Sequence, residues 1–385
     1  MRVMMIGPYP RSPGRIDGGV AAAMTYLSQA LVTVQGVQLI GVRIAWDAES
    51  SLGGEFGWPI VDLSMGRFGL STLYRRQRVR LRELIRQHRP HIIHAQGVDV
   101  AGYLSVNSGM PTVVTVHGLL SENAKYQTNL ANRARSTVAG MLTERRTIRR
   151  ATDLIAISPF VAQYYGAKIA GRVHEVPNAV APRFFGLTRL PERGRYLFAG
   201  RIAHGKGLID LLHAIARNTS SVTKVVLAGA APDKSYENEV RMASERLGLS
   251  NVVTFAGLLD EEALLGEFSR AEALLLPSHQ ETAPMVVQQA MAAGLAVIAS
   301  KVGGIPFQIE HDATGLLFEP GNVEELTGLL SRLGADRSLG PRLGAAARKS
   351  ACARYDANEV ALATISVYQH VLTSNARLGG HRKSP

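Results

Sequence analysis

The stretch RYLFAGRIAHGKG at residues 195–207 sets the pattern from which the fold is predicted. An apolar run ends at a glycine, a glycine-rich loop follows, and a helical pattern comes next. Similar short runs recur at KVVLAG (224–229), VVTFAG (252–257), ALLLPS (273–278) and AVIAS (296–300). Buried strands that alternate with helices indicate a parallel sheet with right-handed crossovers. This half of the chain is therefore predicted to be a doubly wound α/β domain.

The first half of the chain shows the same alternation. Its predicted strands are VMMIG (3–7), VQLIGVRI (37–44), HIIHA (91–95), TVVTVHG (112–118) and DLIAIS (153–158). Residues 20–33 and 70–88 repeat apolar residues at helical spacing. A chain of 385 residues is too long for one comfortable core. We therefore predict two Rossmann-like domains, with ligands bound in a cleft at the facing carboxyl ends of the strands.

The predicted domain boundaries follow breaks in this rhythm. Residues 1–185 form the first domain and 186–357 the second, with APRFFGLTRLPERGR (181–195) as a linker rich in turn residues and charge. A helix at 358–376 is expected to pack back on the first domain, and 377–385 to be a disordered tail.

Composition narrows the class of protein. With 46% hydrophobic and 19% charged residues, the chain resembles an ordinary soluble protein. The single cysteine, Cys352, cannot form an internal disulfide, and no Cys/His cluster has metal-ligand spacing. The N-terminal apolar run is too short for a signal peptide, and no apolar stretch reaches the roughly 18–20 residues that span a bilayer. We expect a cytoplasmic protein with no metal site and no cofactor.

The charge balance is basic, with 43 Lys+Arg against 31 Asp+Glu. Such a field attracts phosphorylated small molecules, nucleic acid or an anionic membrane. Neither a recognition-helix signature nor basic residues interleaved with aromatics occurs, which argues against nucleic acid.

The most basic stretch is LYRRQRVRLRELIRQHR (73–89), and basic residues recur at ERRTIRR (144–150). In the first stretch Leu73, Leu81, Leu84 and Ile85 fall on one helical face. The arginines mostly lie elsewhere on the helix, and the basic helix at 73–89 could lie on anionic lipid. The alternative is a helix packed on its sheet with a solvated basic face.

Two glycine-rich segments are candidates for binding phosphate. In GRIDGGVAAAM (14–24), Gly18 and Gly19 open a helix whose N-terminus offers free N–H donors. A dinucleotide-binding G-x-G-x-x-G is absent, which counts against a dehydrogenase. In FAGRIAHGKG (198–207), Arg201 and Lys206 leave a strand end and could hold a diphosphate. The alternatives are an ordinary βα loop and two solvated cations.

Two further segments place polar side chains beside predicted strands. In HQETAPMVVQQAMAAG (279–294), Glu281 lies at the mouth of a helix that Thr282 caps, with Pro284 in its first turn. Gln289 follows about two turns along. The alternative is a pre-helix acid and a surface amide. His117 ends the strand TVHG (115–118) and could polarise a ligand hydroxyl or be a satisfied structural histidine.

Taken in order, these segments resemble the GT-B glycosyltransferases of family 4, which are retaining and metal-independent. The resemblance covers nearly the whole chain. It rests on GGV near the start, PHIIHAQG, TVHG, VPNAV (176–180), AGRIAHGKG, LGLSNVVTFAGLL (247–259), LLLPSHQETAPMVVQQAMAAG, VGGIP and TGLLFEPGN (314–322).

The resemblance implies roles for individual residues. Arg201 and Lys206 would grip the donor diphosphate, Glu281 and the backbone after it the donor sugar, and His117 would lie near the reacting centre. The base would rest near Gly229 and Leu258–Leu259. The implied donor-binding set is Gly18, Gly19, Gly200, Gly229, Leu258, Leu259, Thr282, Ala283, Pro284, Met285, Val286 and Gln289.

Gln289 departs from the family pattern, which has Glu at both ends of an E-x7-E element. The second Glu accepts hydrogen bonds from ribose hydroxyls, and Gln keeps an acceptor oxygen but loses the charge. The swap is expected to weaken donor binding by about 1 kcal/mol, roughly five- to tenfold.

The resemblance implies transfer of a sugar from a UDP- or GDP-sugar to a hydroxyl of a glycan or lipid-linked acceptor. The setting would be bacterial-type cell-surface polysaccharide or glycolipid synthesis, in the cytoplasm or at the inner face of the membrane. A sugar-nucleotide epimerase of the same fold and a non-catalytic sugar-nucleotide-binding protein remain as alternatives. Acceptor choice is assigned to first-domain loops, including 45–70 and 118–135.

Overall fold

The computed structural model describes residues 1–12, 14, 16–45, 56–65, 72–123 and 130–380. The chain divides into two compact units. Unit 1 comprises Met1–Pro13, Val20–Ala179 and Ala357–Pro385, and unit 2 comprises Gly14–Gly19 and Val180–Asp356. The change of unit at Ala179–Val180 comes before the predicted end of the first domain at residue 185.

Unit 1 contains a seven-stranded sheet of order β3-β2-β1-β4-β5-β6-β7, with every neighbouring pair parallel. Its strands are β1 (Arg2–Gly7), β2 (Gln38–Ala45), β3 (Ile60–Ser64), β4 (Ile92–Gln96), β5 (Thr112–Val116), β6 (Asp153–Ala156) and β7 (Arg172–Glu175). Its helices are α1 (Gly19–Thr33), α2 (Arg75–His88), α3 (Val100–Val106), α4 (Leu120–Asn123), α5 (Leu130–Arg150), α6 (Pro159–Tyr165), η2 (Gly166–Lys168) and α14 (Ala357–Gly380).

Unit 2 contains a six-stranded parallel sheet of order β10-β9-β8-β11-β12-β13. Its strands are β8 (Arg195–Ala199), β9 (Lys224–Ala228), β10 (Val253–Gly257), β11 (Ala273–Leu276), β12 (Ala296–Ser300) and β13 (Leu316–Phe318). Its helices are α7 (Pro182–Phe185), η3 (His204–Lys206), α8 (Leu208–Ala216), α9 (Lys234–Arg246), α10 (Glu261–Arg270), α11 (Met285–Ala292), η4 (Ile305–Phe307), α12 (Val323–Ala335) and α13 (Leu339–Tyr355).

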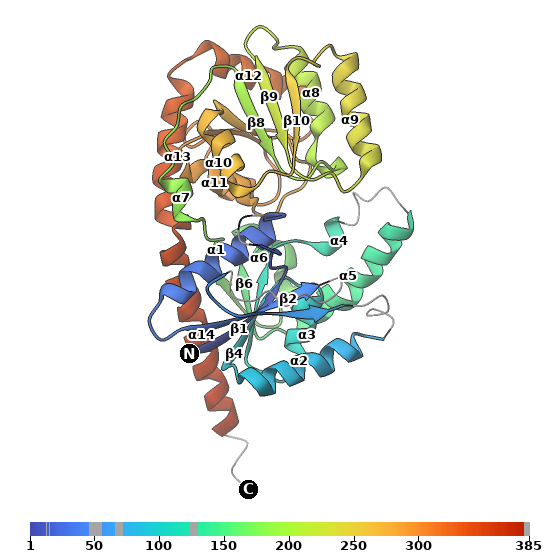
Figure 1. Ribbon diagram of the computed structural model, residues 1–385, viewed down its shortest axis with the longest axis vertical. Coiled ribbons are helices and arrows are strands. Elements are labelled where there is room, and N and C mark those ends of the chain that lie inside the picture. Colours follow the sequence, from blue (N-terminus) through green and yellow to red (C-terminus); the bar gives the residue numbers. More distant parts are fainter. Residues whose placement is uncertain (13, 15, 46–55, 66–71, 124–129, 381–385) are drawn as a thin grey trace. The chain divides into compact units, whose positions relative to one another are not determined.

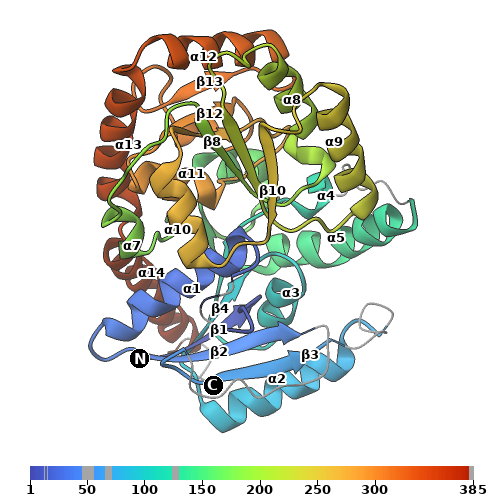
Figure 2. The same cartoon turned by 45° about the horizontal axis from the view of Figure 1, so that its top comes forward.

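The predicted α/β class with doubly wound parallel sheets is confirmed. Helices flank the strands of each unit on both sides (Figures 1 and 2). Strands buried on both faces read as continuous apolar runs, and the central strands β1 and β8 are buried along most or all of their length. This is why the central strands could be found from their sequence.

Three strands at or near sheet edges gave no such signal. In β3, Asp62 interrupts the apolar run, and its carboxylate accepts hydrogen bonds from Arg43 of β2 at 2.8 and 2.5 Å. β7 reads RVHE and is largely exposed, and β13 has only three residues. An edge strand need not be apolar on both faces, so its sequence lacks the pattern of a buried strand.

The predicted linker is instead a packed part of unit 2. Phe184 of α7 is fully buried and meets Phe268 of α10 edge to face, with ring centroids 5.7 Å apart. Farther along, the backbone N–H groups of Leu190 and Glu192 donate to Ser269 and Arg270 at 3.0 and 2.8 Å. The turn residues in this segment therefore shape a surface loop tied to α10 rather than a free connection.

The C-terminal helix α14 belongs to unit 1. It runs from Ala357 to Gly380, so residues 377–380 continue the helix where the sequence predicted the start of a disordered tail, and 381–385 lie outside the described residues. The buried Tyr368 hydroxyl is 2.6 Å from Nδ1 of His94 in β4.

The basic helix α2 turns its apolar face inward. Leu81 and Leu84 are buried in unit 1, while most of its arginines are exposed. Leu81 and Leu84 therefore pack against the protein, whereas Leu73 is 50% exposed. Contact of the basic helix with an anionic membrane stays a prediction. The predicted helix start at residue 70 lies outside the described residues, and α2 itself begins at Arg75.

Candidate functional site

The loop after β8 carries two of the predicted catalytic residues, Arg201 and Lys206. It turns into α8 at Gly207, whose φ of +62° favours glycine. A Cβ there would lie 2.0 Å from the Pro277 carbonyl oxygen, so no larger residue fits without movement. The close approach presses this loop against the loop that follows β11.

Three contacts join the loop after β11 to the loop after β8 and to the start of α8. The His279 N–H donates to the Gly205 carbonyl at 2.9 Å, and His279 Nε2 lies 3.0 Å from the Asp210 carboxylate. The Lys206 ammonium forms an ion pair with Glu281 Oε1. Two residues predicted from separate segments are thus brought into direct contact.

Glu281 is held from several directions. Ser278 Oγ donates to the same carboxylate oxygen that Lys206 contacts, at 2.8 Å. The Gly304 N–H, after β12, donates to the Glu281 carbonyl at 3.4 Å. The carboxylate is therefore oriented by its neighbours before any ligand binds.

Arg201 differs from Lys206 in having an exposed side chain. Among the described residues, no acceptor for its guanidinium is found. It follows Gly200, whose N–H donates to Ala228 at 2.9 Å. An arginine at this strand end is available to an anionic ligand.

Gly200, Gly229 and the pair Leu258–Leu259 directly follow the carboxyl ends of β8, β9 and β10. A Cβ on Gly229 would lie 2.0 Å from the Gly200 carbonyl oxygen, and its φ is +149°. Its N–H donates to Gly257 at 2.7 Å, directly before Leu258 and Leu259. Gly229 is thus required by backbone packing, apart from any ligand it contacts.

The helix after Glu281 starts later than predicted. α11 begins at Met285, and Pro284 takes the N-cap position with an extended backbone. Thr282 therefore lies before the cap, and its predicted capping role is wrong. Pro284 cannot continue the helix backward through the residue before it, because the α region is disfavoured there.

The residues along α11 are mostly inward-facing. Thr282, Ala283 and Met285 are buried, and Val286 is half-buried. Gln289 is 5% exposed, so the alternative of a surface amide is wrong. Within unit 2, a Cβ on Gly19 would lie 3.4 Å from Met285 Cγ, while the adjacent Gly18 has a φ of +92°.

In unit 1, His117 directly follows β5 and belongs to a buried polar cluster. Its Nε2 lies 2.6 Å from Gln96 Oε1 at the end of β4. Burial lowers the pKa of His117 to about 4, while a hydrogen bond with Asn178 opposes that shift. The ring is therefore neutral near pH 7.

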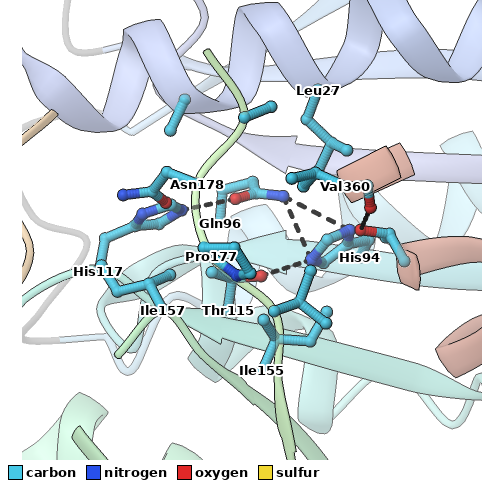
Figure 3. Close-up of a pocket in the computed structure, with 14 residues that line it drawn as sticks. Leu27, His94, Gln96, Thr115, His117, Ile155, Ile157, Pro177, Asn178 and Val360 are labelled. Carbon is cyan, nitrogen blue, oxygen red and sulfur yellow. Dashed lines mark hydrogen bonds between the residues drawn. The ribbon is translucent and has the colours of Figure 1, made fainter. Parts of the chain in front are cut away.

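A small cavity lies among these side chains (Figure 3). Its volume of about 20 Å³ is enough for roughly one water molecule. Its polar lining comes from His94, Gln96, Thr115, His117 and Asn178. Gln96 and His94 were not singled out as site residues. They stand in PHIIHAQG, and the sequence signal there was two polar residues inside an otherwise apolar strand.

The described residues contain no group of three or more His, Cys, Asp or Glu side chains that could hold a metal ion. No helix in the described part of the chain is long and apolar enough to cross a membrane. The predicted acceptor loops are described in part, since 46–55, 66–71 and 124–129 lie outside the described residues.

Two family models match adjoining parts of the chain. The family described as glycosyl transferases group 1 matches residues 184–350, and glycosyltransferase family 4 matches residues 17–184. Among curated proteins, the uncharacterized glycosyltransferase YqgM of Bacillus subtilis is 26% identical over 292 residues, 74% of this chain and 79% of that protein. D-inositol 3-phosphate glycosyltransferase of Streptomyces bingchenggensis is 32% identical over 190 residues, 47% of this chain and 42% of that protein.

Solved structures share the fold over nearly the full length. Sucrose-phosphate synthase of Thermosynechococcus elongatus has a TM-score of 0.83 at 21% identity and covers 97% of this chain and 100% of that one. Anabaena HepE in complex with UDP and glucose has a TM-score of 0.71 at 20% identity and covers 95% and 99%. These likenesses assign the fold.

Proposed function

Because this chain belongs to the group 1 glycosyltransferases of family 4 and has their GT-B fold, we propose that it transfers a sugar from a nucleotide diphosphate-sugar to an acceptor hydroxyl with retention of configuration. The observation that carries the proposal is the Lys206–Glu281 ion pair, which joins the loops that follow the neighbouring strands β8 and β11, with Arg201 on the same loop as Lys206. Two cations and an oriented carboxylate suit an anionic diphosphate joined to a polyhydroxylated sugar. The resemblance assigns Arg201 and Lys206 to the diphosphate and Glu281 to the sugar.

Leaving-group stabilisation is the main catalytic effect in this proposal. As the bond from the anomeric carbon to the phosphate oxygen breaks, negative charge grows on the diphosphate, and preorganised cations lower the energy of that state. The acceptor O–H bond breaks as the glycosidic bond forms, and its proton passes to the departing phosphate oxygen. The reaction then needs neither a metal ion nor a carboxylate nucleophile.

The donor is proposed to be a UDP- or GDP-sugar. HepE was solved with UDP and with UDP-glucose, which supports a uridine nucleotide at a fold of this kind. Gly18 and Gly19 would line the phosphate side, and Gly200, Gly229, Leu258 and Leu259 the base. The backbone of 282–286 would hold the sugar, and Gln289 the ribose.

Donor-panel turnover tests this function. The chain is incubated with UDP- and GDP-sugars and an acceptor panel, and nucleoside diphosphate release and product mass are measured. Transfer is expected, and Arg201→Ala/Lys206→Ala should lose it while staying folded by circular dichroism. Near-normal turnover in that variant contradicts the assignment. Conversion of donor alone indicates an epimerase, and binding without turnover across the panel indicates a non-catalytic binder.

A lipid-linked acceptor is favoured by the surface of α5. Val138, Met141 and Leu142 are 48%, 65% and 42% exposed. Exposed Arg145 and Arg149 continue the same helical face, since these positions follow the i, i+3, i+4, i+7, i+11 spacing. Apolar side chains beside arginines suit the headgroup region of an anionic bilayer. We therefore place the proposed membrane contact on α5, with synthesis of cell-surface polysaccharide or glycolipid at the inner face.

Vesicle flotation tests this contact. The protein should float with vesicles containing phosphatidylglycerol and not with phosphatidylcholine alone. Arg145→Gln/Arg149→Gln and Met141→Ser should each weaken flotation, whereas Arg75→Gln/Arg82→Gln on α2 changes the same charge and should have a smaller effect. Equal flotation on both lipids, or release by the α2 change alone, contradicts the assignment to α5.

A further inference from the structure

A chain of buried hydrogen bonds runs inward from His117 (Figure 3). Gln96 Oε1 lies 2.6 Å from His117 Nε2, and the Gln96 amide nitrogen lies 3.1 Å from His94 Nε2. His94 Nε2 is also 2.7 Å from the Thr115 hydroxyl. Gln96, His94 and Thr115 are buried, so each polar atom depends on these contacts for a partner.

The Gln96 amide nitrogen also lies 3.4 Å from His94 Nδ1. With the Gln96 amide oriented as in this structure, we assign the donors and acceptors as follows. The Gln96 oxygen can only accept, so His117 donates from Nε2–H. The Gln96 amide N–H₂ can only donate, so His94 accepts at Nε2, as it also does from Thr115. A neutral His94 then carries its proton on Nδ1 and donates to the Tyr368 hydroxyl at 2.6 Å.

At the buried end of this series of hydrogen bonds, His94 is held in place by its packing. His94 is fully buried between β4, β5 and α14, and its ring meets that of Tyr368 edge to face at 5.5 Å. Gln96 therefore has its amide fixed on one side by a rigid contact. On the other side it meets His117, a half-buried residue that also has a hydrogen bond with the Asn178 side chain.

We propose that Gln96 is a positioning residue that holds His117 as the Nε2–H tautomer and so leaves Nδ1 as the hydrogen-bond acceptor of the ring. An imidazole with a fixed tautomer presents a defined acceptor to a hydroxyl of a bound sugar. This proposal rests on the proposed function only for what His117 meets when substrate is bound. The tautomer itself is a property of the free protein.

Substitutions that keep the size of the Gln96 side chain distinguish its proposed role in orienting His117 from a role in filling space. Gln96→Met keeps the length and volume of the side chain but removes both hydrogen bonds. Gln96→Glu keeps an acceptor toward His117 and adds a negative charge. Thr115→Val, which lines the same cavity and contacts His94 but has no hydrogen bond with His117, is the matched control.

The experiment is ¹⁵N NMR of the full chain labelled at histidine, with the His117 signals assigned by their loss in His117→Gln. The wild-type and Thr115→Val proteins should show His117 protonated at Nε2. Gln96→Met should show a mixture of tautomers, and Gln96→Glu should keep Nε2–H and raise the pKa of His117. The titratable groups along this chain are His94 of β4 and Tyr368 of α14, and no charged side chain among the described residues pairs with His117.

Turnover adds a second measurement. Gln96→Met should lower kcat at least tenfold with little change in the Kd for nucleoside diphosphate, whereas Thr115→Val should change kcat less than threefold. Two results would overturn the proposal when all variants are folded. One is a wild-type His117 ring protonated at Nδ1, and the other is a single, unchanged tautomer in Gln96→Met. Absence of any transfer by the wild-type protein refutes the proposed function and leaves the NMR result standing.

Discussion

Lys206 and Glu281 form an ion pair, although the family resemblance implies that one binds the diphosphate and the other the sugar of the donor. Their side chains are 21% and 11% exposed, so both charges are partly removed from water. Each residue thus orients the other before any ligand binds, and a diphosphate would share Lys206 with Glu281. In the proposed function, the stability of the site and its activity would therefore depend on the same two residues.

The first prediction concerns the partly buried carboxylate. Lys206→Met removes its cationic partner and leaves Glu281 with Ser278, so the free energy of unfolding should fall by about 1–3 kcal/mol. Adding Glu281→Gln should recover part of that loss, because the unpaired charge is gone. Urea unfolding of the four proteins of this cycle measures the coupling. Lys234→Met, which breaks an exposed pair with Glu237 on α9, is the control and should cost less than about 1 kcal/mol. Additive effects of the two site changes would show that the pair is not coupled.

The second prediction concerns the close approach of Gly229 to Gly200. In Gly229→Ala, the new Cβ meets the Gly200 carbonyl oxygen at 2.0 Å and the backbone has a φ of +149°, so β8 and β9 must move apart. Thermal unfolding should show a loss of roughly 2–4 kcal/mol. Gly328→Ala in α12 meets nothing within 4 Å and should stabilise by about 0.5–1 kcal/mol. Equal stability of the two variants would show that the backbone at the carboxyl ends of β8 and β9 can move apart without a loss of stability.

The parallel sheets could be predicted because their central strands are buried on both faces and read as unbroken apolar runs. β3 escaped detection because its apolar run is interrupted by Asp62, a buried carboxylate paired with Arg43. β7 escaped detection because its polar RVHE segment lies at a sheet edge, where burial on both faces is not required. The linker prediction failed for a different reason. Pro182 and Gly186 were interpreted as breaks between domains, whereas the buried ring of Phe184 fastens this segment to unit 2.

The sequence predicted candidate site residues only where a charged residue type also stands in a recognisable place, such as a glycine-rich loop after a strand. Arg201 and Lys206 follow a strand on a glycine loop, a pattern visible in the sequence. The partnership of Gln96 with His117 joins residues 21 positions apart on neighbouring strands, and the chain's order gives no sign of it. A surface amide stayed open as the alternative for Gln289, because helical spacing shows which residues share a face but not which face is covered.

The third prediction concerns that amide. Gln289→Glu restores the charge that the family has at this position, and it should tighten the Kd of UDP or GDP about five- to tenfold in calorimetric titration, if Gln289 contacts the ribose as proposed. Gln288 is 1% exposed with no hydrogen-bond partner for either amide atom in the described structure, so Gln288→Glu is the matched control. It should destabilise the fold without tightening nucleotide binding. A tighter Kd in both variants would point to a general electrostatic effect of the added charge.

The fourth prediction concerns the stability of the fold at acidic pH. Burial lowers the pKa of His94 to about 3 and that of His117 to about 4, both from 6.5. The unfolded chain therefore binds protons at these two histidines below pH 6.5 while the folded protein does not. Their stabilisation is fully present above pH 6.5 and is lost as pH falls toward 4, by at most about 1.4 kcal/mol per pH unit for each ring. The two histidines together should lower the free energy of unfolding, measured in urea, by about 2–4 kcal/mol between pH 7 and pH 5.

His94→Gln should remove about half of this pH dependence, whereas His213→Gln, on the exposed side of α8, should leave it unchanged. Other titrating groups contribute equally to all three proteins, so the difference between their slopes is the test. Parallel slopes for wild type and His94→Gln would show that His94 is already protonated in the folded protein, and the donor and acceptor assignment through Gln96 would fall with it.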